Sequence, residues 1–239
     1  MNKDVNLGCS RTEGSHGRGA MCGRDGHSCG MDSCTERTTY LTPFFSGENK
    51  HKKFVIILNG PPSSGKDAGC MELKKFFPHS RHSEMKEHLF EMALLISGVS
   101  KEHWFQRYNN RDLKELPWDK LGGLTQREFL IRISEDWCKP VFGKTYFGQR
   151  AADRIANRQS KFYLFSDGGF VDELVPISTL DDVVIKIIQI HRDGCTYDGD
   201  SRSYVDGTPY GIETTKITNN GTLEEFYEKL FAEIHSLVG

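Results

Sequence analysis

Short apolar runs alternate with amphipathic segments along most of this chain. From Phe54 onward, runs of strand length are rich in β-branched and aromatic residues, and the segments between them repeat apolar residues at helical spacing. The apolar runs predict strands at Phe54–Leu58, Phe162–Phe165 and Val183–Ile190. The amphipathic segments predict helices at Lys66–Phe77, Glu84–Ser97, Thr125–Cys138, Tyr146–Arg158 and Thr222–Leu237. Residues 98–123 follow no single period.

Two helix starts carry a capping-box signature, in which Thr125 is followed by Glu128 and Thr222 by Glu225. Pro78 is expected to end the helix that begins at Lys66.

The alternation of strands and helices predicts the fold class. Such an order favours right-handed crossovers and a parallel sheet that helices cover on both faces. We therefore expect residues 51–239 to form an α/β domain with a three-layer α/β/α architecture. Gly60, Asp167 and Arg192 each follow a predicted strand. Because the carboxyl ends of parallel strands meet at one edge, these residues predict a shared site there.

Residues 1–50 differ in composition from the rest. They are rich in Gly, Ser, Arg and Thr and have almost no aliphatic periodicity, so we expect a disordered or low-complexity leader, or an upstream extension unrelated to the fold. A zinc knuckle is an alternative, although the cysteine spacing is looser than the C-x-x-C pairs of most zinc sites. The candidate ligands are Cys9, His16, Cys22, His27, Cys29 and Cys34.

Composition narrows the possible functions. The 239 residues carry a net charge of -2, so no overall basic field predicts a nucleic-acid partner. No apolar run approaches the roughly 20 residues that span a bilayer, and no secretory h-region is visible. Scattered cysteines such as Cys70, Cys138 and Cys195 are typical of reduced thiols. We expect a cytoplasmic protein that binds neither nucleic acid nor membrane.

The segment from Gly60 to Asp67 carries the strongest chemical signal. Its spacing, G-x-x-x-x-G-K, is that of a phosphate-binding loop, and it lies between a predicted strand and a predicted helix. Backbone N–H groups of such a loop converge on one anion, and Lys66 adds a positive charge. Asp67 stands where Ser or Thr normally contacts magnesium. The alternative is a glycine turn with a surface lysine. The candidate ATP-binding residues are Gly60, Ser63, Ser64, Gly65, Lys66 and Asp67.

Phosphoryl transfer also requires an acid for magnesium and a surface for the acceptor. Asp167 follows a strand and can hold the ion directly or through water. Gly168 and Gly169 allow a substrate to approach the backbone closely. The alternative is an aspartate that opens a Gly-Gly turn.

Arginines suit phosphate oxygens because the guanidinium can bind them with two hydrogen bonds. Arg127 and Arg132 lie on the helix that begins near Thr125, and Arg127 ranks first because it is in the first turn. Arg192 and Arg202 flank a polar, glycine-bearing segment after a strand, which predicts a lid at residues 191–203. Solvated helix charges and an ordinary surface loop are the alternatives.

Weaker candidates lie nearer the irregular region. Lys86 could contact the acceptor, and Trp104 or Trp118 could form the wall of a nucleobase site, while Tyr108 is a further weak candidate. More often, such aromatic residues anchor packing.

Four stretches of the chain match one family in their order. They are Leu58-Asn59-Gly60 to Lys66-Asp67; Lys114-Glu115-Leu116-Pro117 with Thr125-Gln126-Arg127-Glu128-Phe129-Leu130 and Phe142-Gly143; Ser166-Asp167-Gly168-Gly169-Phe170-Val171-Asp172-Glu173; and Asn219-Asn220-Gly221-Thr222-Leu223-Glu224-Glu225. Over roughly residues 54–237, the chain resembles the deoxynucleoside monophosphate kinases of tailed bacteriophages, which have the P-loop nucleoside monophosphate kinase fold. Asp after the loop lysine also occurs in that family.

The resemblance implies transfer of the γ-phosphate of ATP to a deoxynucleoside 5'-monophosphate with Mg²⁺, in the host cytoplasm if the chain is phage-encoded. On that reading the catalytic residues are Lys66, Asp167 and Arg192. Lys66 holds the donor phosphates, Asp167 lies at the magnesium or the acceptor side, and Arg192 is a lid arginine. Asp67 and Asp167 are the candidate magnesium ligands, and Arg202 joins the ATP site. Residues 98–158 form a helical acceptor-binding region, and a homodimer is possible. The acceptor-binding candidates are Lys86, Trp118, Arg127, Arg132, Gly168 and Gly169.

The chain departs from the family pattern at three positions. Gly169 replaces an arginine and so removes a cation from the acceptor side, Phe147 stands where Trp is common, and Ser134 where Gly is common. Two other functions stay open: a P-loop kinase of another small acceptor, and a nucleotide-binding module with a degenerate active site.

Overall fold

The computed structural model describes residues 51–77, 79–200 and 202–238. The chain divides into two units, Met1–Thr39 and Tyr40–Gly239, and all described residues belong to the second unit. The leader and its cysteines lie outside the described residues, and so does Pro78.

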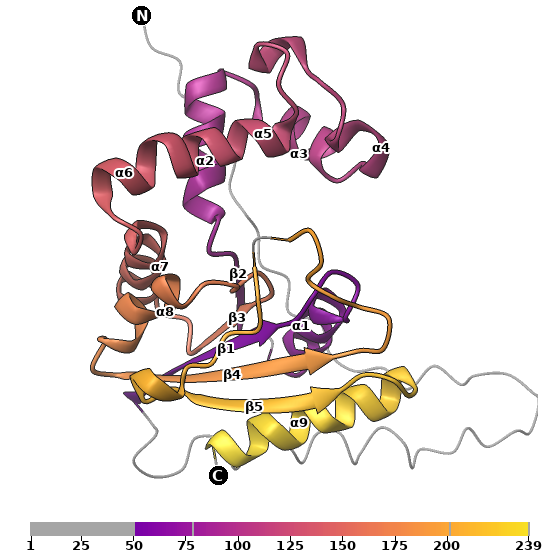
Figure 1. Cartoon of the computed structure of the whole chain (residues 1–239). Helices are drawn as coiled ribbons and strands as arrows, with labels where there is room; N and C mark the ends of the chain where they lie inside the picture. The colour runs from indigo at the N-terminus through magenta and orange to yellow at the C-terminus, as the bar shows by residue number, and fades with distance from the viewer. Residues whose placement is uncertain (1–50, 78, 201, 239) are drawn as a thin grey trace, which may run out of the picture. The chain divides into compact units, whose positions relative to one another are not determined.

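A five-stranded, all-parallel sheet forms the centre of the described unit (Figure 1). Its order is β2-β3-β1-β4-β5. The strands are β1 (Lys53–Asn59), β2 (Arg81–Ser83), β3 (Phe162–Phe165), β4 (Val183–His191) and β5 (Glu213–Thr218). The expected α/β class with a parallel sheet is confirmed. Because β1 lies between β3 and β4, strands are added on either side of it, which is the topological switch point where open sheets of this class bind ligands.

Two strands were not predicted. β2 has only three residues, Arg81-His82-Ser83, and β5 reads Glu-Thr-Thr-Lys-Ile-Thr with Ile217 as its one buried residue. Both are edge strands with little apolar content, so neither forms a run that distinguishes it from a loop.

Helices cover both faces of the sheet. On one face, α1 (Lys66–Phe76) and α9 (Leu223–Val238) pack through Leu73, Phe226 and Leu230 against side chains of β1 and β4. On the other, α7 (Tyr146–Asn157) and α8 (Val171–Ser178) pack through residues such as Ile155 and Leu174. The three-layer expectation is thus confirmed. α8 was not predicted, since it follows two glycines and contains Pro176.

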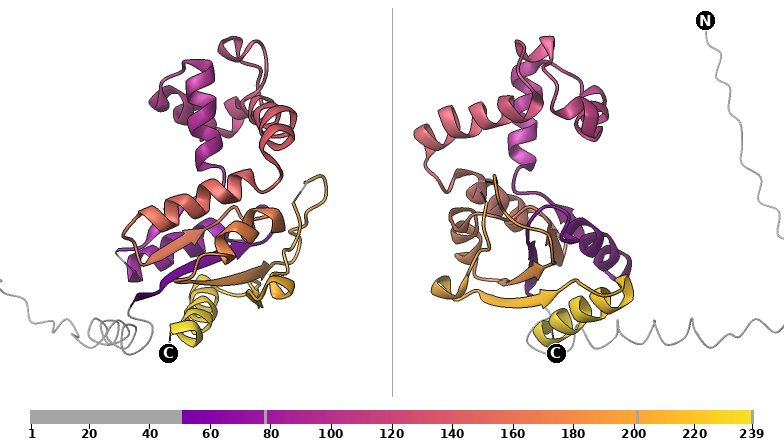
Figure 2. Two further views of the ribbon diagram at one scale, coloured as in Figure 1. Left: turned by 90° about the vertical axis from the view of Figure 1, so that its left-hand side faces the viewer. Right: turned by 45° about the vertical axis from the view of Figure 1, so that its right-hand side comes forward.

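A 3-10 helix, η7 (Thr208–Tyr210), lies between β4 and β5 in the chain, and the other helices form a cluster of their own (Figures 1 and 2). Its core contains the fully buried Trp104 together with Phe90 and Leu130. The predicted helix over Thr125–Cys138 is helical throughout but changes from α to π at Arg132. The elements are α2 (Glu87–Ser97), α3 (Lys101–Tyr108), α4 (Arg111–Lys114), η5 (Asp119–Leu121), α5 (Gln126–Ile131), η6 (Arg132–Cys138) and α6 (Lys139–Phe142).

Both capping boxes are confirmed. Thr125 Oγ1 accepts from the backbone N–H of Glu128 at 3.1 Å, and Glu128 Oε2 accepts from that of Thr125 at 2.8 Å. Thr222 and Glu225 make the same reciprocal pair at 3.2 and 3.0 Å. Among the described residues, no helix is long and apolar enough to cross a membrane.

Candidate phosphate-binding site

Residues 60–65 form the loop that connects β1 to α1. Ser63 and Gly65 have positive φ values of 65° and 109°, and such alternation turns successive backbone N–H groups toward one side. The first N–H groups of α1 follow directly, and a helix leaves these groups without carbonyl partners. The loop geometry is therefore that of an anion site.

Two glycines in this loop are required by close contacts. A Cβ on Gly60 would lie 2.6 Å from Ser64 Oγ, and one on Gly65 would lie 2.5 Å from Asn219 Nδ2. Asn219 donates from that atom to the carbonyl of Ser64 at 2.8 Å, so the segment before α9 supports the loop from behind. Ser64 Oγ is buried without a hydrogen-bond partner.

Lys66 is folded into the loop. Its ammonium donates to the carbonyl of Pro61 at 2.6 Å, and the residue is buried. Burial lowers the pKa of Lys66, and the charge of Arg202 lowers it further, while Asp67 and Asp200 oppose the shift. Lys66 is thus a desolvated cation that lies among charges from several segments.

Asp167 links the end of β3 to the start of α2. Its Oδ1 accepts from the N–H of Met85 at 2.9 Å, and its Oδ2 accepts from that of Lys86 at 3.4 Å. Burial lowers the pKa of Lys86, but Asp167, Tyr108 and Glu84 together raise it above its usual value. Asp167 therefore has a structural partner on each oxygen and holds Lys86 close to the edge of the sheet.

Three of the four candidate arginines interact with this edge. Arg192 Nη1 donates to the carbonyl of Ser63 at 3.2 Å. Arg202 Nε donates to Asp200 Oδ1 at 2.9 Å, and this hydrogen bond is the main reason that the pKa of Asp200 is lowered to about 2. The charge of Arg127 contributes to the same shift, which brings the start of α5 into the group. Arg132 is exposed at the start of η6, and its charge helps to lower the pKa of Glu128 instead.

The aromatic candidates fill the helical cluster. Trp104 is fully buried, so it is a core residue and cannot form a wall for a ligand. Trp118 is half-buried between His103, whose ring centroid is 5.1 Å away, and the guanidinium of Arg107, also at 5.1 Å. Lys86 lies 3.5 Å from Glu84 and 5.7 Å from the centroid of Phe90.

Asn59 is a site residue that sequence reasoning missed. At the end of β1, its Nδ2 donates to the carbonyls of Gly168 at 2.9 Å and Ser203 at 3.2 Å, and its Oδ1 accepts from the N–H of Val205 at 2.9 Å. A buried amide thus joins β1, the end of β3 and the segment after β4. The available signal was a polar residue closing an otherwise apolar strand.

Glu173 on α8 is a second residue whose chemical role the sequence did not predict. It is half-buried, and its Oε2 is buried without a hydrogen-bond partner. Burial, reinforced by the charge of Asp167, raises the pKa of Glu173 to about 8, although Lys139 and Arg202 oppose the shift. The carboxyl therefore keeps its proton at neutral pH.

Asp67 and Asp167 are the expected magnesium ligands. No group of three or more His, Cys, Asp or Glu side chains able to hold a metal ion occurs in the described part of the chain. Magnesium in phosphate sites needs less, because one or two carboxylates act together with phosphate oxygens and water. Asp67 is exposed in the first turn of α1, and both oxygens of Asp167 already accept backbone N–H groups. These two carboxylates are the donors available for such a limited set.

Comparison with known proteins adds no family assignment: no protein-family model matches the chain, and no curated protein matches it significantly. The α/β fold, with its five-stranded all-parallel sheet in the order 2-3-1-4-5, is consistent with a P-loop NTPase-like fold.

Proposed function

We propose that this protein transfers the γ-phosphate of ATP to a deoxynucleoside 5'-monophosphate. The observation that carries the proposal is the composition of one sheet edge. There the phosphate loop and Lys66 lie with Asp167 from the end of β3 and with arginines from the segment after β4.

Each group has a role that its position supports. Lys66 would release the carbonyl of Pro61 and hold the donor phosphates. Arg192, which already contacts the loop at Ser63, would neutralise charge on the transferring group. Arg127, in the first turn of α5, would hold the acceptor phosphate. Asp67 and Asp167 would hold a magnesium ion, which screens phosphate charge when bound.

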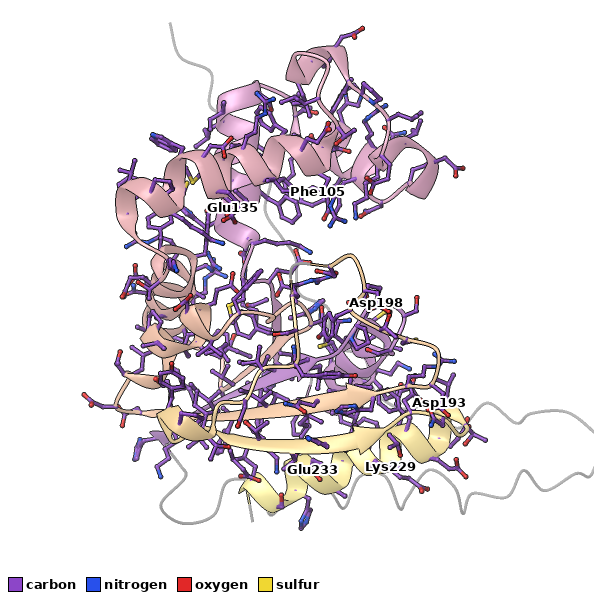
Figure 3. All side chains as sticks on the ribbon, in the orientation of Figure 1. Phe105, Glu135, Asp193, Asp198, Lys229 and Glu233 are labelled. Carbon is purple, nitrogen blue, oxygen red and sulfur yellow. The ribbon has the colours of Figure 1, made fainter. Side chains whose placement is uncertain are left out.

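The segment at residues 191–203 is suited to cover the reaction. It leaves β4 at the carboxyl edge, and its return is fixed by Asn59, which donates to the carbonyl of Ser203 and accepts from the N–H of Val205. Figure 3 shows Asp193 of this segment beside α9, and the N–H of Asp193 donates to Asn220 Oδ1 at 2.9 Å. Both ends are therefore anchored, and the residues between them can exclude water.

The test is ADP release measured with each deoxynucleoside monophosphate as acceptor and water as the blank. We expect at least one to raise the rate well above the blank. If none does, the proposal is wrong. A wider panel of small phosphate acceptors then separates a P-loop kinase of another substrate from a protein without transferase activity.

A nucleotide-binding module without turnover is the second candidate. The engagement of both Asp167 oxygens by backbone N–H groups favours it, because a carboxylate in that position stabilises α2 even if it holds no metal. ATP binding by calorimetry, with no product from any acceptor, is the result that this candidate predicts.

A further inference from the structure

Arg202 and Gly169 are in direct contact. A Cβ added to Gly169 would lie 2.7 Å from Arg202 Cγ and 2.8 Å from its Cδ. Gly169 is buried and has no positive φ, so its backbone does not require glycine. The missing side chain instead makes room for the stem of an arginine that comes from the other side of β1.

The guanidinium of Arg202 has one carboxylate partner. It binds Asp200 through Nε and Nη2, on the two oxygens of the carboxylate. The fork that binds a carboxylate in this way fits two phosphate oxygens equally well. Arg202 is partly exposed and Asp200 largely buried, with side-chain exposures of 31% and 11%. Arg202 is therefore the more accessible side chain of the pair.

The charged groups around Arg202 and Asp200 show which parts of the site lie near this pair. The charge of Arg202 lowers the pKa values of Lys66 and Glu173, and the charge of Asp167 raises the pKa of Arg202. The charge of Arg127 on α5 lowers the pKa of Asp200. The guanidinium is thus surrounded by groups from the end of β3, from α8 and from the helical cluster, whereas Arg192 contacts the phosphate loop.

The backbone around Arg202 is held in place. Asn59 binds Ser203 and Val205, and its Nδ2 also binds the carbonyl of Gly168, next to Gly169. Both sides of the Arg202–Gly169 contact are therefore fixed to the same buried amide, and the arginine is preorganised rather than free to sample solvent.

We infer that Arg202 binds the phosphate of the acceptor nucleotide, that Gly169 provides the room for its stem, and that Asp200 is the counter-ion which the phosphate displaces. This inference rests on the proposed function for the identity of the acceptor. It moves Arg202 from the ATP side to the acceptor side. It also explains how Gly169, which has no side chain of its own, still has the positively charged side chain of Arg202 beside it.

The test is calorimetric binding of deoxynucleoside monophosphates without ATP, and of ATP without acceptor. We expect Arg202→Gln to weaken monophosphate binding by about tenfold or more, since it removes a charged hydrogen-bond pair, and to change ATP affinity by less than about twofold. Arg150→Gln is the matched control, because Arg150 pairs with Asp153 at 3.0 Å on α7. It should leave both affinities unchanged.

Two further variants test the coupling. Gly169→Ala should weaken monophosphate binding as Arg202→Gln does, and the double variant should be no weaker than either single one, because both remove the same contact. Asp200→Asn should tighten monophosphate binding, because it removes the competing carboxylate. Circular dichroism and thermal unfolding establish that each variant is folded.

The outcomes separate this inference from the proposed function. If the wild-type protein binds monophosphates but never phosphorylates them, the proposed function fails, and the binding comparison still decides the role of Arg202. Loss of ATP affinity in Arg202→Gln, or weaker monophosphate binding in Asp200→Asn, overturns the inference even if the kinase is active. A wild-type protein that binds no monophosphate overturns both.

Discussion

At the scale of single residues, the phosphate loop depends on backbone geometry more than on side chains. Gly65 combines a φ of 109° with a contact that leaves no room for a Cβ, whereas Ser63 adopts a positive φ of 65° despite its side chain. A left-handed conformation costs a non-glycine residue about 1–2 kcal/mol. Such strain is retained where it serves a site, and here it helps to turn N–H groups toward one anion.

Lys66→Met is expected to reduce the turnover number of the proposed transfer by about a hundredfold or more, because it removes a preorganised charge beside the transferring phosphate. Steady-state kinetics with a responsive acceptor measures this effect. The control is Lys74→Met on the exposed side of α1, which should retain near-normal turnover. Near-normal turnover in the Lys66 variant would refute the role given to this lysine.

Glu173 predicts a pH dependence of stability. Its folded pKa of about 8 lies above its ordinary value of 4.5, so between these values the folded state binds more protons than the unfolded state. Stability from this group is therefore lost as pH rises from about 4.5 to 8. Glu173→Gln should flatten the dependence in this window and be the more stable form at pH 8, by up to a few kcal/mol. Urea unfolding of both proteins across this range measures it, and parallel curves would contradict the assignment.

At the scale of elements, one buried lysine joins β4, β5 and α9. Lys186 is fully buried and lies 2.6 Å from Glu213 Oε1 and 2.9 Å from Glu233 Oε2. Lys186 and Glu213 are register partners on neighbouring strands, and Glu233 lies on α9 (Figure 3). Because both acids are partly exposed, the lysine is the group with the larger desolvation cost.

This arrangement predicts strong non-additivity. Glu213→Gln or Glu233→Gln alone should cost little, since the other acid still neutralises Lys186. The double variant should lose about 3–5 kcal/mol, because it leaves the buried Lys186 without a counter-ion, with only the carbonyl of Glu233 and the hydroxyl of Ser236 as acceptors. In a Lys186→Met background the same two substitutions should cost almost nothing. Chemical denaturation of the full set measures the coupling, and additive effects would show that the network carries no cooperative energy.

At the scale of the described unit, ligand binding and folding are linked through the phosphate loop. The loop lies between the sheet and α1, so a bound nucleotide stabilises the folded state by mass action. ATP at a hundred times its dissociation constant should raise the free energy of unfolding by about 2.7 kcal/mol. Thermal unfolding with and without ATP measures the gain, which should vanish in Gly65→Ala. An unchanged midpoint in the wild-type protein would count against nucleotide binding by this loop.

Residues 1–50 have almost no aliphatic periodicity and so little apolar surface to bury, which predicts that residues 51–239 fold without the leader. A protein lacking residues 1–50 should unfold cooperatively at the same midpoint as the full chain. A large drop in that midpoint would show that the leader contributes to the core.

Most of the fold could be read from local patterns. Strands β1 and β3 contain continuous apolar runs, and β4 is apolar apart from Lys186 and Gln189 before its last residue, because these strands are buried on both faces. The capping boxes of α5 and α9 are encoded within four residues each. Edge strands β2 and β5 were not predicted, because partly exposed strands contain too few apolar residues to be recognised. The phosphate loop was visible because its glycines and lysine are contiguous.

The sequence by itself determined the α/β class, the order of strand, loop and helix around Lys66, and the residues that follow each central strand. Only the tertiary structure decided which of these residues meet. Arg202 lies against Gly169, 33 residues away in the chain. Asn59 binds Gly168 across 109 residues, and Asp167 binds Met85 and Lys86 across 82 and 81 residues. Such contacts depend on strand order and loop path. No local period encodes either of these, because hydrophobic spacing records only which side of an element is buried.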